Sequence, residues 1–453
     1  MSYQLAVEQL YARGHELAPP QPGVPRRKFD LAHMRRLMAE LGDPQTTFPS
    51  VLIAGTNGKG STASTLASVL TASGYRAGLY TSPHLERINE RIRIGSELIG
   101  DEAFAQLYFR VDDTSNRLVA AGELPHPPSF FEVMTAIAFL YFAEQKVEIA
   151  VLEVGLGGRL DATNIVEPIV SVITDLGLDH MDYLGPTLTH IAKEKAGILR
   201  RNGVMVTLPQ HPEANFALGE VAVPLEVRGV NAAAYIPDRG LAQTSPFRNV
   251  YPLRVLGEDI TIDAPLGGAH QQRNLALAIA TAVELREHRG FAKITAGSIA
   301  AGIHQIEWPG RLELLTSGGV EFLLDVAHNP DGAWTLRSAL GQLPESRPRT
   351  LLFSCLRDKA VDAIAQVLFP LFDASADRVQ DHIVLAPMMN PRAASIDDLK
   401  QAAARLEIPA IEASDVAAAV EQARAVTPAG GLVVVTGSVY LIGDVRHILK
   451  KEI

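Results

Sequence analysis

Short runs of consecutive apolar residues alternate along this chain with stretches of helical periodicity. In the N-terminal half, these runs occupy residues 51–54, 77–80, 149–154, 169–174 and 203–208. Strands of a parallel sheet have this composition, because helices cover both of their faces. The pattern predicts an α/β fold with a mostly parallel sheet.

The alternation is interrupted once. Residues 229–268 hold Pro, Gly and short β-like pieces, which predict a peripheral excursion, and helical periodicity returns at residues 271–288. Residues 307–311 predict a linker, because Pro309 cannot continue a helix and Gly310 permits a sharp turn.

Beyond this linker the alternation resumes. Further strand-like runs occupy residues 320–326, 350–354, 382–386 and 432–436. We therefore expect residues 1–306 to form one α/β domain and residues 311–453 a smaller one, joined at residues 307–310.

The loop after the first apolar run predicts a nucleotide site. It comprises Gly55, Thr56, Asn57, Gly58, Lys59, Gly60 and Ser61, and a helix-like stretch follows. Backbone N–H groups of such a loop surround phosphate oxygens, the helix N-terminus favours an anion, and Lys59 adds a positive charge. The alternative is a plain Gly/Asn turn between strand and helix.

The loop departs from the strict G-x-x-x-x-G-K-[ST] pattern. Ile53 stands where the first glycine belongs, and Gly60 stands at the magnesium-binding hydroxyl, which arrives one residue late as Ser61. The departure favours a divergent ATPase over a GTPase.

Composition narrows the class of protein, its compartment and its partners. The 453 residues are 47% hydrophobic and 20% charged, which is typical of globular proteins, and the net charge of -10 argues against a general nucleic-acid binder. A single cysteine, Cys355, fits a reducing compartment. The apolar stretch at 130–143 is too short to span a bilayer, and no signal peptide is evident. We expect a cytoplasmic protein without membrane or nucleic-acid partners.

Two further clusters follow apolar runs. Glu153 ends one run and precedes a glycine-rich loop, and His180 lies shortly after the next run. In open α/β sheets, ligands collect where parallel strands end, and a carboxylate there suits Mg²⁺. The alternatives are a structural hydrogen bond for Glu153 and a structural role for the lone His180.

Eight motifs occur in one order along nearly the whole chain, at residues 55–61, 80–85, 153–164, 178–180, 193–198, 272–274, 325–330 and 436–438. The set resembles that of the folylpolyglutamate synthase and dihydrofolate synthase family within the Mur ligase superfamily. Residues 158–164 are more similar to the bacterial bifunctional enzymes than to single-activity folylpolyglutamate synthases.

The resemblance implies an N-terminal P-loop ATPase domain and a smaller Rossmann-like domain that binds glutamate. It implies a monomeric, ATP-dependent ligase that uses one or two Mg²⁺ ions. A pteroate or folate carboxylate would form an acyl phosphate, and the amine of L-glutamate would displace phosphate. Alternatives are only one of these two activities, another Mur-type amino-acid ligase, or an ATP-gated binding module without catalysis.

The resemblance also implies roles for individual residues. Nucleotide binding falls to the loop residues 56–61 together with Asn274, Arg311 and Asp325, and metal binding to Ser82, Glu153 and His180. The implied catalytic residues are Lys59, Glu153, His180 and Lys195, with Lys195 carbamylated by carbon dioxide. The implied substrate contacts are Phe131 and Asp161 for the pterin and His328 and Ser438 for glutamate.

These roles have simpler alternatives. Lys195 belongs to a charged run that would suit an exposed helix, and Phe131 could belong to the core of an apolar helix. The motifs at 325–330 and 436–438 could each be an Asx turn.

Overall fold

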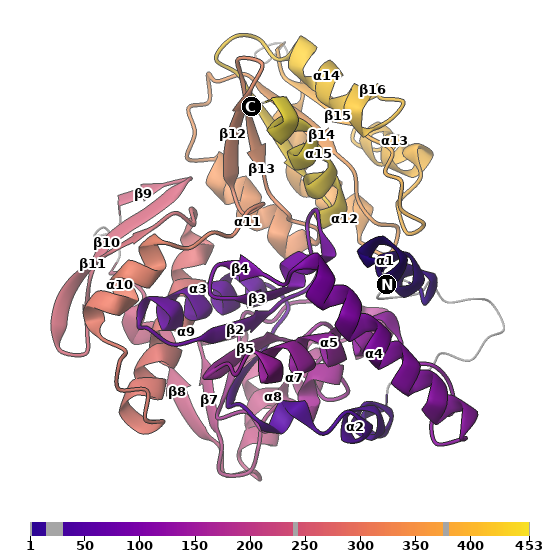
Figure 1. The fold of residues 1–453 in the computed structure, drawn as a ribbon. Coiled ribbons are helices and arrows are strands. Elements are labelled where there is room, and N and C mark those ends of the chain that lie inside the picture. The colour runs from indigo at the N-terminus through magenta and orange to yellow at the C-terminus, as the bar shows by residue number, and fades with distance from the viewer. Residues whose placement is uncertain (1, 15–29, 239–242, 375–379, 453) are drawn as a thin grey trace.

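Two layered α/β units, each built on its own sheet, make up the protein (Figure 1). The computed structural model describes residues 2–14, 30–238, 243–374 and 380–452. The N-terminal unit forms the lower part of the view and the C-terminal unit the upper part, as the colours show.

The N-terminal sheet has the strand order β4-β3-β2-β5-β1-β6-β7-β8 within the described residues. The strands are β1 (Ser50–Ala54), β2 (Ala77–Tyr80), β3 (Ile92–Ile94), β4 (Glu97–Leu98), β5 (Ile149–Glu153), β6 (Val170–Ile173), β7 (Val204–Thr207) and β8 (Arg228–Asn231). All neighbours pair in parallel except the β2–β3 and β3–β4 pairs. The predicted mostly parallel sheet is confirmed, with β1 at its centre.

Helices cover both faces of this sheet. They are α1 (Tyr3–Ala12), α2 (Leu31–Glu40), α3 (Lys59–Ala72), α4 (Asp101–Ala120), α5 (Phe130–Glu144), α6 (Met181–Leu184), α7 (Leu188–Ala196), α8 (Pro212–Ala222), α9 (Ala269–His288) and α10 (Ala296–His304). One buried cluster lies under α1, α2, α4 and α5, and a second under α3, α9 and α10. Alternate residues of β1 and β5 feed the two clusters, which is why these strands are apolar throughout.

Helix α5 shows how composition sets burial. Ser129 and Glu132 form a capping box at its start, and the residues that follow are apolar on all sides. A helix without a polar face is buried in the core of a large domain. Of the helices in the described ranges, none has both the length and the apolar character needed to cross a bilayer.

The predicted excursion begins later than the sequence indicated. Strand β8 pairs with β7 and so belongs to the main sheet, which corrects the predicted start at residue 229. The excursion itself is an antiparallel sheet of β9 (Gln243–Ser245), β10 (Arg248–Val255) and β11 (Glu258–Ala264). It lies at the edge of the molecule in Figure 1.

The C-terminal sheet has the order β12-β13-β17-β14-β15-β16 within the described residues, and only β12 and β13 pair antiparallel. Its strands are β12 (Glu313–Ser317), β13 (Val320–Leu324), β14 (Arg349–Phe353), β15 (His382–Leu385), β16 (Ile411–Glu412) and β17 (Leu432–Thr436). Its helices are α11 (Pro330–Leu340), α12 (Val361–Leu368), α13 (Ile396–Ala404), α14 (Val416–Val426) and α15 (Val439–Glu452). The predicted Rossmann-like fold is confirmed.

Short 3₁₀ helices complete the chain: η1 (Pro44–Thr46), η2 (Ile88–Arg91), η3 (Ala162–Ile165), η4 (Ala232–Tyr235) and η5 (Phe369–Phe372). Between α10 and β12, residues 305–312 belong to no helix or strand. This segment includes residues 307–310 of the predicted linker, where Pro309 cannot continue a helix.

Helix α10 packs on α3 through a glycine. A Cβ atom on Gly302 would lie 2.5 Å from the Cα atom of Val69, so alanine forces the two helices apart. We expect Gly302→Ala to lower the free energy of unfolding by about 1–3 kcal/mol and to lower the thermal unfolding midpoint. The matched control is Gly297→Ala in the same helix, where the nearest atom would be 3.8 Å away. Equal midpoints for both variants would contradict this account of the packing.

Candidate active site

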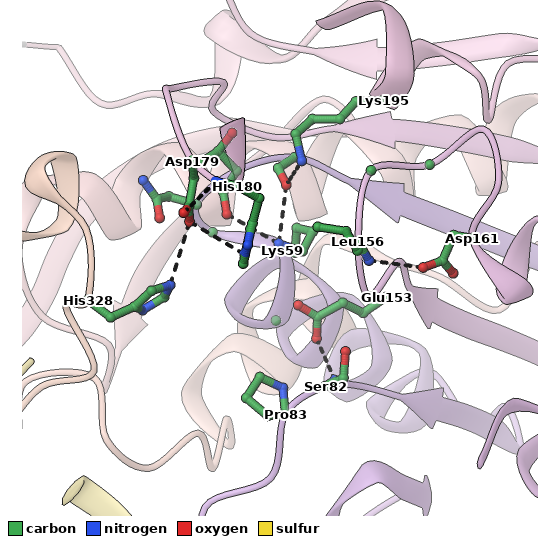
Figure 2. A pocket seen from close by; sticks show the side chains of 18 of the residues that line it. Lys59, Ser82, Pro83, Glu153, Leu156, Asp161, Asp179, His180, Lys195 and His328 are labelled. Carbon is green, nitrogen blue, oxygen red and sulfur yellow. Dashed lines mark hydrogen bonds and ion pairs between the residues drawn. The ribbon is translucent and has the colours of Figure 1, made fainter. Parts of the chain in front are cut away.

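The ends of β1, β5 and β6 open into a cavity of about 680 Å³ between the two units. Every site residue expected from the sequence lines this cavity. Parallel strands bring their carboxyl ends to one edge of the sheet, so motifs far apart in the sequence meet there. Figure 2 shows the central side chains of the cavity.

The loop between β1 and α3 is held by its glycines and its lysine. Gly58 has a φ of +86°, and a Cβ atom there would lie 2.2 Å from Oδ1 of Asn274. Only glycine fits this left-handed, crowded position. The Nζ atom of Lys59 donates to the carbonyl oxygens of Gly55 and Thr56 at 3.2 Å.

Lys195 lies at the base of the same loop. Its Nζ donates to the carbonyl oxygen of Gly55 at 2.6 Å, and its side chain is buried. Burial, followed by the nearby charge of Lys59, lowers the pKa of Lys195 to about 7. The alternative of an exposed helical lysine is therefore wrong for Lys195. It holds for Lys193 on the same helix, whose exposed side chain pairs with Glu220 at 3.0 Å.

Glu153 ends β5 and is buried at the edge of the cavity. Its Oε2 accepts a hydrogen bond from the backbone N–H of Ser82 at 3.1 Å, which brings these two residues together (Figure 2). A carboxylate and a hydroxyl are the hard oxygen donors that Mg²⁺ prefers, and phosphate oxygens and waters complete its shell in nucleotide sites. The donor set therefore fits a magnesium ion that binds with the nucleotide.

No cluster of three or more His, Cys, Asp or Glu side chains able to hold a metal occurs in the part of the chain that the structure describes. His180, the third expected ligand, has a left-handed backbone at φ +50° and faces Asp179.

Asp179 joins the two units. Lys359 of the C-terminal unit donates to its carboxylate at 2.8 Å, and Asn329 donates to it at 3.2 Å. Only 5% of the Lys359 side chain and 11% of the Asp179 side chain are exposed. His328 also faces Asp179, at 3.9 Å, from the C-terminal unit (Figure 2).

These neighbours set the charges at the interface. Burial raises the pKa of Asp179, but the Lys359 ammonium outweighs it, so its pKa lies well below the usual range. Burial and then Lys359 lower the pKa of His180 to about 3 and that of His328 to about 4. Both histidines are therefore neutral at physiological pH.

Asp325 and Arg311 face each other beyond the linker. Burial raises the pKa of Asp325, and Arg311 opposes this shift. Asp325 also accepts backbone hydrogen bonds from Leu312 and Ala327 at 3.0 Å. The bond from Ala327 is of the Asx-turn type. The Asx turn that was the alternative for residues 325–330 is therefore present, and Asp325 also lines the cavity.

The expected pterin contacts, Phe131 and Asp161, line the same cavity. Phe131 is half-buried and lies so close to Gly155 that a Cβ atom there would be 2.6 Å from the ring. The carboxylate of Asp161 accepts hydrogen bonds from the backbone of Leu156 at 2.9 Å and of Thr163 at 3.0 Å. Asp161 thereby holds the glycine-rich loop.

Both units of the chain match families of known proteins. Residues 53–282 match the Mur ligase middle domain, and residues 310–439 match the Mur ligase glutamate ligase domain. The dihydrofolate synthase/folylpolyglutamate synthase of Bacillus subtilis is 34% identical over 93% of this chain and 95% of its own length. This chain belongs to the folylpolyglutamate synthase and dihydrofolate synthase family of Mur ligases.

Solved structures of the family share the fold. A folylpolyglutamate synthase from Mycobacterium tuberculosis complexed with ADP gives a TM-score of 0.85 at 33% identity, covering 99% of this chain and 98% of that one. E. coli FolC in complex with DHPP and ADP gives 0.79 at 26% identity, covering 100% and 98%. The predicted family, fold class and ATP-dependent ligase activity are confirmed.

Sequence reasoning missed Lys359 and Asn329 as parts of the site. Asn329 lies inside the motif at 325–330, and its side chain donates to Asn57 of the loop at 3.0 Å. Lys359 lies in a short polar stretch after β14 that carries no recognisable motif. Its position after a buried strand of the second sheet was the only available signal.

Lys359 offers a test of the interface. We expect Lys359→Met to lower stability by about 3 kcal/mol, because it leaves the Asp179 carboxylate buried without its ammonium partner. The measurement is the thermal unfolding midpoint. The control is Lys400→Met, which breaks an exposed pair with Glu412 and should change stability by less than about 1 kcal/mol. An unchanged midpoint for Lys359→Met would contradict the importance of the buried pair.

Proposed function

We propose that this enzyme joins L-glutamate to the carboxylate of dihydropteroate and to the γ-carboxylate of folates. The observation that carries the proposal is a single cavity lined both by the phosphate loop of the N-terminal unit and by His328 and Ser438 of the C-terminal unit. The relatives named for both activities support it. The alternative is that only one of the two acceptors is used.

The reaction has two steps. A carboxylate oxygen of the acceptor attacks the γ-phosphorus of ATP, the bond to the bridging oxygen breaks, and ADP leaves. The glutamate amine then attacks the acyl carbon, phosphate leaves with the electron pair of the C–O bond, and the amine loses a proton. Both steps bring anions together, so they need positive charge in a site that excludes water.

We assign the phosphate-binding role to residues 56–61, with Lys59 stabilising the transferred phosphoryl group. Its side chain is near the loop carbonyls, which keeps the ammonium in the cradle. Magnesium, when bound by Ser82, Glu153 and His180, would supply further positive charge to the phosphate oxygens. A second magnesium ion is part of the same proposal.

Asn274, Arg311 and Asp325 are proposed to hold the adenine and ribose, and this set straddles a domain boundary at residues 307–310. Nucleotide binding would thereby favour the closed arrangement of the 1–306 and 311–453 units, which protects the acyl phosphate from hydrolysis.

For the acceptor we propose stacking of the pterin on Phe131, with Asp161, which also lines the cavity, accepting from ring N–H groups. His328 and Ser438 are proposed to contact glutamate. The Nδ1 atom of His328 lies 2.8 Å from the Val326 carbonyl, so in the neutral ring Nδ1 donates, and Nε2, which lies 3.9 Å from the Asp179 carboxylate, is an acceptor. An acceptor at this point suits an ammonium or amine group.

We further propose a cytoplasmic monomer without nucleic-acid or membrane partners. The net charge of -10 supports the absence of a nucleic-acid partner, and the single cysteine supports a reducing compartment.

The decisive experiment is ADP release by the purified protein with MgATP and L-glutamate. Dihydropteroate, tetrahydrofolate and no acceptor are compared, and the products are weighed by mass spectrometry. We expect release with both acceptors, each product heavier by one glutamyl residue, and roughly 10²-fold slower turnover for Lys59→Ala. Release with one acceptor would assign a single activity, and release with neither would refute the folate assignment.

We also propose that Lys195 is carbamylated. Its pKa near 7 keeps the amine neutral above that pH. The nitrogen then attacks the carbon of carbon dioxide, the electron pair of one C=O π bond moves to oxygen, and the nitrogen loses a proton to leave the carbamate. With isotopically labelled bicarbonate, a carbamate carbon resonance should grow as pH rises through about 7. The signal should be absent from Lys195→Met and present in Lys193→Met. A resonance that survives in Lys195→Met would contradict the assignment.

A further inference from the structure

The linker carries a tryptophan that packs into the N-terminal unit. Trp308 lies between α10 and β12, outside any helix or strand, and contacts the buried cluster under α3, α9 and α10. Its side chain is only partly exposed. The segment that joins the two units is therefore anchored to the core of one of them.

The indole ring presses against the phosphate loop. A Cβ atom on Gly60 would lie 2.7 Å from Cζ2 of Trp308 and 3.3 Å from Oε2 of Glu153. The first distance is shorter than any real contact, so a side chain at position 60 and this ring exclude each other. Trp308 thus explains why glycine occupies the place of the magnesium-binding hydroxyl in the strict loop pattern.

Two guanidinium groups flank the same ring. Arg93 on β3 lies 5.5 Å from the ring centroid, and Arg311, just past the linker, lies 5.9 Å from it. Both distances are within the range of cation–π attraction. Arg311 also lines the cavity, and we have proposed that it binds nucleotide. The ring therefore contacts both the phosphate loop of the N-terminal unit and a residue from the other side of the linker.

The ring is held without a hydrogen bond. Its Nε1–H is buried and donates to no acceptor among the described residues. Packing and cation–π attraction are less directional than hydrogen bonds, so the ring can shift with Gly60 without breaking a bond.

We propose that Trp308 is a positioning residue that couples the linker to the phosphate loop. Nucleotide binding moves or tightens the loop at Gly60, the ring follows, and the linker and Arg311 move with it. By reciprocity, the linker conformation that suits this ring favours nucleotide binding. This inference rests on the proposed function, because it requires ATP in the loop.

A double-mutant cycle tests the contact. Binding of a non-hydrolysable ATP analogue with Mg²⁺ is measured by calorimetry for Gly60→Ala, Trp308→Leu and the double variant. We expect Gly60→Ala to weaken binding roughly tenfold or more, since its Cβ overlaps the ring. The double variant should bind more tightly than Gly60→Ala alone, because leucine removes the overlapping atom. Independent effects of the two substitutions would overturn the proposal.

Trp334 provides the matched control. It is the only other tryptophan of the chain, lies on α11 and is 59% exposed. Combining Trp334→Leu with Gly60→Ala should give additive effects, since the atoms nearest a Cβ at position 60 belong to Trp308 and Glu153. Rescue of Gly60→Ala by Trp334→Leu as well would show that the effect is not specific to Trp308, and would overturn the proposal.

Fluorescence tests the coupling with the contact intact. In Trp334→Phe, Trp308 is the sole indole, so its emission reports on the linker alone. We expect the emission to change on addition of the analogue, with a midpoint equal to the calorimetric Kd. Unchanged emission despite measured binding would overturn the proposal. Absence of calorimetric binding in the unsubstituted protein would instead contradict the proposed function.

Discussion

The carbonyl oxygen of Gly55, at the end of the central strand, accepts hydrogen bonds from two lysines of the N-terminal unit. Lys195 reaches it at 2.6 Å and Lys59 at 3.2 Å, from different helices. Burial and the neighbouring charge of Lys59 disfavour a second positive charge on Lys195, so Lys59 supplies the positive potential of the loop. The lowered pKa of Lys195 is the cost of this arrangement, and it makes that amine reactive.

The balancing negative charge lies at the boundary between the units. Asp179 follows β6, and its principal partner, Lys359, comes from the C-terminal unit together with Asn329. A buried ion pair is stable only while both partners are present, so this contact favours the arrangement in which the cavity is enclosed by both units. Trp308 adds a second connection, from the linker to the loop. The contacts that hold the two units together therefore lie beside the loop that we propose binds phosphate.

Individual strands show which parts of the fold the sequence could predict. The buried runs that became β2 and β17 were predicted to the residue, because a short, continuous apolar run is typical of a strand covered on both faces. Strands β4 and β8 were missed or misassigned, since both lie at sheet edges and most of their residues are exposed. An edge strand lacks the apolar signal, and its pairing depends on a neighbour distant in the sequence.

For the site, the sequence by itself determined the chemistry-bearing groups that follow strands, including Lys59, Glu153 and His180, because a parallel sheet brings strand ends to one edge. Only the tertiary structure decided that Lys195 is buried, although its charged surroundings in the sequence resembled an exposed helix. It alone decided that Lys359 faces Asp179. Burial and charge pairing depend on which distant segments pack together, and the local sequence carries no record of that choice.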